Sequence, residues 1–163
     1  METEPERDTI IFTGDGSYMM MNSDIYSSVL NGRKLIIVVC DNGGFAVINK
    51  LQNNTGNASF NNLIADCNIA TGPFAVDFAS HARAMGAAVE DVHSIAALAD
   101  AFARAKASKK TYVICLKVDA HEGWTKEGHT WWEIGTPSVS NRPAVMDAHA
   151  EVERGRSRQR AGV

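Results

Sequence analysis

The segment TGDGSYMMMNSDIYSSVLNGRKLIIVVCDNGGF, residues 13–45, decides the fold of this chain. A short apolar run at residues 10–13 leads into it and has the β-branched composition of a buried strand. A helical pattern follows from Ser17, and Gly32 is typical of its end. Residues 35–40 form a second apolar run, as expected of a parallel strand that is buried on both faces. The segment therefore predicts a βαβ unit.

Polar residues follow both predicted strands. Asp15 comes directly after the first strand, and Asn42 comes just after the second. Because such crossovers join parallel strands, both side chains are expected at the carboxyl edge of the sheet, where open α/β sheets bind ligands. Carboxylate, amide and backbone carbonyl oxygens are suitable ligands for Mg²⁺. Gly16 and Ser17 lie at a helix start, whose unpaired N–H groups favour an anion such as a diphosphate.

The remaining sequence continues the alternation of strands and helices. Asp77 and Ser94 are placed to cap two helices, and strands are predicted near residues 87–89 and 111–118. Pro143 can open a last helix. This order predicts an α/β fold, a doubly wound parallel sheet with helices on both faces. The apolar helix positions expected to face the core are Tyr18, Met21, Ile25, Val29, Ile95, Leu98 and Phe102.

Length and composition exclude several classes of protein. The chain of 163 residues is long enough for one domain with a sizeable core, and its net charge of −3 offers no electrostatic footprint for nucleic acid. The sequence contains no recognisable signal peptide or membrane-spanning run. Cys40, Cys67 and Cys115 show neither metal-ligand spacing nor a disulfide framework, and Cys40 and Cys115 are expected to be buried structural thiols. These features predict a cytoplasmic protein.

The two polar loops together carry a family resemblance. Gly14-Asp15-Gly16-Ser17, followed at this spacing by Asp41-Asn42-Gly43-Gly44-Phe45, resembles the cofactor signature of thiamine-diphosphate enzymes. The resemblance implies that Asp15, Asn42 and the Gly44 carbonyl hold Mg²⁺, which bridges to the diphosphate. Asp41 stands where the family usually has an asparagine, at a position that is not a metal ligand. An ordinary pair of α/β loops is the alternative. The other implied cofactor-binding residues are Gly14, Gly16, Ser17, Phe45 and Val47.

The C-terminal part narrows the resemblance. Residues 131–137 with Val139-Ser140, together with residues 14–52 and 76–87, resemble the trihydroxycyclohexane-1,2-dione hydrolases of inositol catabolism, a branch of the same family. This resemblance implies hydrolysis of a C–C bond in a cyclic dione. The alternatives are an acetolactate-synthase-like activity on a 2-oxo acid, a malonic semialdehyde decarboxylase activity, and a non-catalytic diphosphate-binding or interaction module. Ile48 stands where enzymes of the pyruvate decarboxylase type carry a glutamate, which argues against that chemistry.

The resemblance also implies that other parts of the enzyme lie elsewhere. The glutamate that activates the cofactor belongs to a pyrimidine-binding domain, so no catalytic residue is predicted in this chain, and the chain alone is expected to be inactive. A C-terminal piece of a longer enzyme is implied, acting on a small-molecule substrate as a homo-oligomer. The predicted boundaries are a disordered start at residues 1–8, the thiamine-diphosphate-binding domain at 9–140, and a C-terminal helix with a frayed end, from Arg154 on, at 141–163.

Two segments keep alternative interpretations. Residues 53–72 are rich in asparagine and are expected to form a loop, either a flap over the cofactor or a surface excursion. Trp124, Trp131 and Trp132 lie within nine residues, so their side chains are expected to be shielded from solvent. The alternatives are an interface or core patch, and direct contact with substrate. His121 and His129 flank the same region and are assigned no role.

Overall fold

The structure is a computed structural model in which the chain divides into two compact units. The first unit holds the described residues up to Phe45 and from Phe74 to Ala120, and the second holds those from Ala46 to Cys67 and from His121 onward. We describe each unit by itself. The structure describes residues 7–67, 74–121 and 135–159.

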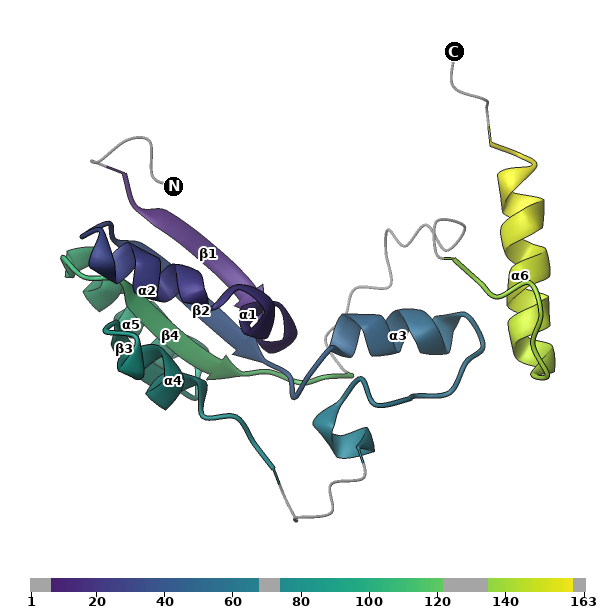
Figure 1. Ribbon diagram of the computed structural model, residues 1–163, viewed down its shortest axis with the longest axis horizontal. Coiled ribbons are helices and arrows are strands. Elements are labelled where there is room, and N and C mark those ends of the chain that lie inside the picture. Colours follow the sequence, from purple (N-terminus) through teal and green to yellow (C-terminus); the bar gives the residue numbers. More distant parts are fainter. Residues whose placement is uncertain (1–6, 68–73, 122–134, 160–163) are drawn as a thin grey trace. The chain divides into compact units, whose positions relative to one another are not determined.

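The first unit is built on a four-stranded parallel sheet, in which the strands run in the order β1-β2-β4-β3 (Figure 1). The aliphatic run of β2 lies inside this sheet, between β1 and β4, and its residues Ile36 and Val38 are 0% exposed. The prediction of a strand buried on both faces is therefore confirmed for β2. The strands are β1 (Thr9–Gly14), β2 (Leu35–Asp41), β3 (Ala88–Val92) and β4 (Tyr112–Lys117).

Helices cover both faces of the sheet because side chains alternate along each strand. Ile37 and Val39 of β2 pack with residues of α1, α2 and α4, whereas Ile36 and Val38 pack with residues of α5. The predicted doubly wound α/β fold is thus confirmed. The helices are α1 (Asp15–Met21), α2 (Ser23–Leu30), α4 (Phe78–Ala84) and α5 (Ile95–Ala107).

The predicted helix caps are also confirmed. The Asp77 carboxylate accepts a hydrogen bond of 2.8 Å from the Ser80 N–H, and Ser94 Oγ accepts one of 3.1 Å from the Ala97 N–H. Each bond satisfies an N–H group that has no partner within its own helix. Local sequence therefore determines where α4 and α5 begin.

The prediction that the first strand is buried is wrong. β1 lies at the edge of the sheet, where β2 is its only partner among the described residues. Ile10 is 43% exposed, Ile11 is 39% exposed and Phe12 is 66% exposed. The composition of β1 is that of a buried strand, but its place in the sheet leaves its side chains open to solvent.

The first predicted helix differs from the observed structure in two respects. It begins at Asp15 rather than Ser17, and it is interrupted at Asn22, so that α1 and α2 are separate short helices. Met21 was expected on the buried face, but it ends α1 and is 66% exposed. Ile95 was likewise expected to be buried and is 76% exposed, because it is the first residue of α5, and the small residues of that helix face the sheet.

The second unit contains helices and connecting segments. Its elements are α3 (Ala46–Asn54), a single 3₁₀ turn, η1 (Ile64–Asp66), and α6 (Pro143–Arg156). Pro143 opens α6 as predicted, and Val145 and Val152 supply its buried face. Helix α6 continues past Gly155 to Arg156, two residues beyond the predicted start of fraying at Arg154. The three tryptophans and His129 lie outside the described residues.

Candidate functional site

Two turns meet at the carboxyl edge of the sheet. Asp15 begins α1 directly after β1, and Asn42 and Gly44 lie in the turn that leads from β2 towards α3. The parallel register pairs Gly14 with Cys40, so the ends of β1 and β2 are adjacent. The βαβ unit therefore brings together residues from two separate loops, as the sequence predicts.

Three polar groups from these turns face one another. The Gly44 N–H donates a hydrogen bond of 2.5 Å to Asp15 Oδ2. The side-chain oxygen of Asn42 faces the Gly44 carbonyl oxygen and Asp15 Oδ1, and exchanging the oxygen and nitrogen of this amide gives donated bonds of 2.9 Å and 3.0 Å to them. One atom of the Asn42 amide is thus within hydrogen-bond distance of both oxygens.

This arrangement fits a divalent cation. In an octahedral Mg²⁺ site, ligand oxygens lie about 2.0–2.1 Å from the metal, so that neighbouring oxygens are about 3.0 Å apart. The Asn42 amide has that spacing to Asp15 Oδ1 and to the Gly44 carbonyl. Without a cation, the nitrogen side of the amide satisfies the two oxygens, and with a cation the oxygen side can join them as a third ligand. The residues present therefore suit Mg²⁺, with phosphate and water oxygens completing its shell.

Burial makes the Asp15 carboxylate energetically costly without a cation. Its side chain is only 3% exposed. Burial raises the pKa of Asp15 above its usual value of 3.8, and the nearby negative charge of Asp41 adds to the rise, while the Gly44 N–H opposes it. A buried carboxylate with a second acid beside it is a suitable place for a cation, because the cation removes the cost of the buried charge.

This raised pKa predicts a pH dependence of stability. The folded chain holds the Asp15 proton more tightly than the unfolded chain, so its contribution to the free energy of unfolding decreases as pH rises from about 3.8 through the higher folded pKa. The Asp15→Asn variant should lack this decrease. Urea unfolding in EDTA at several pH values measures the difference, and equal pH profiles for wild type and variant would show that Asp15 titrates normally.

Asp41 has a structural role that the sequence reasoning missed. Its Oδ1 accepts a hydrogen bond of 3.0 Å from the Gly43 N–H, and its Oδ2 pairs with Lys117 Nζ at 3.4 Å. The backbone of Gly43 has φ of +82°, a conformation that glycine adopts without strain. An aspartate two residues before a glycine is a signal for this kind of turn, so the role was available in the sequence.

The two turns approach closely at Gly16. A Cβ atom at this position would lie 2.6 Å from Phe45 Cδ1 and 3.1 Å from the Gly44 carbonyl oxygen. The absence of a side chain therefore allows the first turn of α1 to lie against the loop after β2. This contact explains why the sequence requires glycine at this position in the arrangement observed.

We expect Gly16→Ala to weaken binding of thiamine diphosphate with Mg²⁺ by about tenfold, because the added methyl group displaces the Gly44 carbonyl and the Phe45 ring. Calorimetric titration of both proteins measures the change. Gly135→Ala is the matched control, since a Cβ there meets no atom of the described residues within 4 Å. Equal affinity of the Gly16→Ala variant and wild type would contradict the close approach of the two turns.

The other predicted site residues have varied positions. Gly14 ends β1 and is half-buried, and Ser17 is exposed in the first turn of α1. Val47 is 49% exposed in α3, which belongs to the second unit. The structure therefore brings together Asp15, Gly16, Asn42, Gly44 and Phe45, with Gly14 and Ser17 beside them in the chain.

A buried tyrosine fixes the helix that carries Asp15. Tyr18 Oη lies 3.0 Å from His81 Nδ1, and the Tyr18 ring meets Phe78 edge to face at 5.3 Å between centroids. Burial raises the pKa of Tyr18 to about 12, so its hydroxyl keeps its proton at neutral pH. These contacts join α1 to α4 and hold the Asp15 turn in place.

A cavity of about 270 Å³ lies at the carboxyl ends of β2, β3 and β4. In the strand order it lies towards β4, whereas Asp15 follows β1. Cys115 lines it and is 6% exposed, and burial, with the carboxylates of Asp91, Asp77 and Asp41, raises the pKa of Cys115 to about 12. The predicted buried thiol is confirmed for Cys115, whereas Cys40 is only half-buried.

In the described parts of the chain, no helix is long and apolar enough to cross a membrane.

Comparisons with known proteins agree with this geometry. The family model described as "Thiamine pyrophosphate enzyme, C-terminal TPP binding domain" matches residues 1–116. The 3D-(3,5/4)-trihydroxycyclohexane-1,2-dione hydrolase of Clostridium tetani is 30% identical over 151 residues, which are 90% of this chain and 23% of the relative. The corresponding hydrolase of Geobacillus thermodenitrificans is also 30% identical, over 90% of this chain and 24% of the relative. The chain spans about a quarter of the length of these curated relatives.

Solved structures share the fold. The thiamine diphosphate-dependent 4-hydroxybenzoylformate decarboxylase of Rhodococcus jostii RHA1 has a TM-score of 0.62 at 20% identity, over 71% of this chain and 20% of that one. Benzoylformate decarboxylase from Polynucleobacter necessarius has a TM-score of 0.62 at 23% identity, with the same coverage. Together with the family match over residues 1–116, these findings show that the chain belongs to the thiamine pyrophosphate enzymes, as their C-terminal TPP-binding domain.

Proposed function

We propose that this chain anchors the diphosphate of thiamine diphosphate through Mg²⁺ held by Asp15, Asn42 and the Gly44 carbonyl. The observation that carries the proposal is the convergence of these groups from two turns, at the spacing that an octahedral cation needs. The buried charge of Asp15 supports it further, because a cation at this position offsets the cost of burial.

Each residue of the site has a distinct task in this proposal. Asp15 supplies the negative charge, and Asn42 and Gly44 supply neutral oxygens that fix the position of the metal. Gly16 keeps the turns close together, and the backbone N–H groups near Gly16 and Ser17 are placed to receive phosphate oxygens. Bound thiamine diphosphate supplies a nucleophilic carbon for reaction with carbonyl compounds.

The proposed reaction of the whole enzyme is hydrolysis of the C–C bond of trihydroxycyclohexane-1,2-dione, a small-molecule substrate, within a homo-oligomer. Support comes from curated relatives of that name, which are 30% identical over 90% of this chain. A 2-oxo acid decarboxylase is the second candidate, supported by the names of the solved structures at 20% and 23% identity. Ile48 argues against chemistry of the pyruvate decarboxylase type, since it offers no acid after the metal-binding turn.

Calorimetric titration of the chain with thiamine diphosphate tests the cofactor site. We expect saturable binding in Mg²⁺ and loss of that binding in EDTA, because the metal carries the contact between the carboxylate and the diphosphate. Binding of equal affinity in Mg²⁺ and in EDTA would contradict the proposed anchor.

The substrate is tested separately. A pyrimidine-binding domain from a curated hydrolase, supplied in trans, should allow the chain to open the ring of the cyclic dione and should give no release of CO₂ from benzoylformate. The reverse selectivity would exclude the hydrolase and favour the decarboxylase. Neither result affects the proposal for the metal and diphosphate site, which the calorimetric titration tests.

A further inference from the structure

A second pocket, with several basic residues in its lining, lies at the opposite edge of the sheet from Asp15. It has a volume of about 180 Å³ and is formed by the turns that precede β2, β3 and β4. These turns contribute Gly32 to Lys34, Gly86 and Lys109 to Thr111. At about 3.3 Å per residue, the six or seven residues of a strand separate this amino edge from the carboxyl edge by roughly 20 Å. The pocket is therefore distinct from the proposed cofactor site.

All the charged residues that line the pocket are basic. Arg33, Lys34, Lys109 and Lys110 line it, and none of its lining residues is acidic. The chain as a whole has more acidic than basic residues, with a net charge of −3, so composition does not account for four cations around one cavity. Such a concentration of one sign of charge, in a concave site, attracts ions of the opposite sign.

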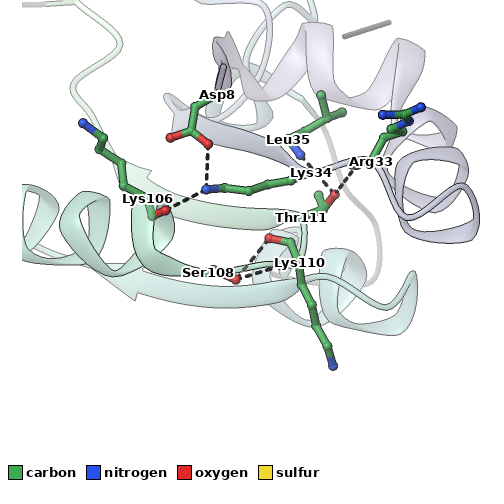
Figure 2. A network of polar contacts seen from close by, with 8 residues as sticks. All are labelled: Asp8, Arg33, Lys34, Leu35, Lys106, Ser108, Lys110 and Thr111. Carbon is green, nitrogen blue, oxygen red and sulfur yellow. Dashed lines mark hydrogen bonds and ion pairs between the residues drawn. The ribbon is translucent and has the colours of Figure 1, made fainter. Parts of the chain in front are cut away.

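Three of these cations are available to a ligand. Lys34 Nζ pairs with Asp8 at 2.7 Å and donates a hydrogen bond of 2.8 Å to the Lys106 carbonyl, so its charge is already engaged. The side chains of Arg33, Lys109 and Lys110 make no ion pair with any residue in the described ranges. In Figure 2 the side-chain nitrogens of Arg33 and Lys110 carry no contact, whereas Lys34 bridges Asp8 and Lys106.

The floor of the pocket is held rigidly by Thr111, which is 2% exposed. Thr111 Oγ1 accepts a hydrogen bond of 3.2 Å from the Leu35 N–H and lies 3.3 Å from the Arg33 carbonyl oxygen (Figure 2). It is also 2.7 Å from Ser28 Oγ. Ser28 Oγ in turn donates to the Ile25 carbonyl at 2.7 Å. These bonds tie the turn that carries Arg33 to the turn that carries Lys110, so that the cations lie around a preformed base.

Gly86, in the lining of this pocket, has a backbone conformation that favours glycine. Gly86 has φ of +92°, and a Cβ atom there would lie 3.0 Å from Val29 Cγ1, another lining residue. A side chain at this position would be strained and would crowd Val29. The pocket thus combines free space, an ordered floor and three cations that make no ion pair within the described residues.

We propose that this amino-edge pocket binds a small phosphate-type anion. A guanidinium presents paired N–H donors that match two phosphate oxygens, and lysines add charge without strict geometry. A water molecule takes about 30 Å³, so the volume of about 180 Å³ accommodates a phosphate group with a few waters. Because the anion touches turns before three strands, it stabilises the folded first unit without competing for the cofactor site.

Nuclear magnetic resonance titration with inorganic phosphate tests this site. Sodium chloride keeps the ionic strength constant, and thiamine diphosphate and Mg²⁺ are left out, so the result does not depend on the proposed function. We expect saturable shifts of the amide signals of Gly32, Gly86 and Thr111. Shifts that do not saturate, or saturable shifts confined to Asp15, Gly16 and Asn42, would overturn the proposal.

Charge-matched variants locate the anion. Lys109→Gln with Lys110→Gln should weaken phosphate binding at least tenfold. Arg142→Gln with Arg158→Gln removes the same charge from exposed positions and should change the affinity less than twofold. Equal weakening by both pairs would show attraction by net charge alone and overturn the site. Lys109→Arg with Lys110→Arg should keep the affinity within threefold, and its failure to bind while folded would also contradict the proposal.

Discussion

The Asp15→Ala variant is expected to bind thiamine diphosphate in Mg²⁺ roughly 100-fold more weakly than wild type, or not measurably. The reason is that Asp15 is the one charged ligand in the proposed set, whereas Asn42 and Gly44 contribute neutral oxygens. Loss of the carboxylate leaves the cation with no negatively charged protein ligand and removes the acceptor for the Gly44 N–H. Calorimetry measures the affinity, and thermal unfolding with and without Mg²⁺ provides an independent readout.

Asp24→Ala is the matched control for this experiment. Asp24 is an exposed acid in α2 and its removal changes the net charge by the same amount. We expect its affinity for the cofactor to stay within twofold of wild type. If Asp15→Ala and Asp24→Ala retain binding equally, Asp15 is not a metal ligand and the proposed anchor is wrong.

Ile114→Ala is expected to lower the free energy of unfolding by about 2–5 kcal/mol. Ile114 is 0% exposed in β4, one of the two inner strands of the sheet, and it packs in the cluster beneath α5. Truncation removes buried apolar atoms and leaves a cavity that the neighbouring strands cannot fill. Urea unfolding followed by circular dichroism measures the loss.

Ile95→Ala makes the same chemical change at a position that is 76% exposed. We expect it to alter the free energy of unfolding by no more than about 0.5 kcal/mol, because it removes few buried contacts. Similar losses for the two variants would contradict the observed packing of α5 against the sheet, in which Ala101 and Ala105, rather than Ile95, are buried.

The parts of the fold that depend on local sequence could be predicted. The aliphatic run of β2 predicts a central strand, and Asp77 and Ser94 predict the starts of α4 and α5, because a capping side chain acts within its own first turn. The exposure of β1 could not be predicted in this way. Its composition resembles that of β2, and only the order of strands decides which of the two has neighbours on both sides.

The candidate site could likewise be predicted only in part from the sequence. The spacing of Asp15 and Asn42 after two strands predicts that they meet, because parallel crossovers place strand ends together. The contact of Gly16 with Phe45 and the orientation of the Asn42 amide depend on atomic packing, which spacing does not encode. The amino-edge pocket is harder to anticipate, since Arg33, Gly86 and Lys110 come from three distant turns and form no motif in the chain.

The outer edge of β1, which pairs with no strand among the described residues, has a consequence for the turn that carries Asp15. An unpaired strand edge is a template on which another extended segment can form a ladder of backbone hydrogen bonds. β1 ends at Gly14, one residue before Asp15, so a segment added along it would restrict the backbone that leads into the carboxylate. Pairing along this edge would hold Asp15 more rigidly and would reduce the entropy lost on binding of the proposed cation.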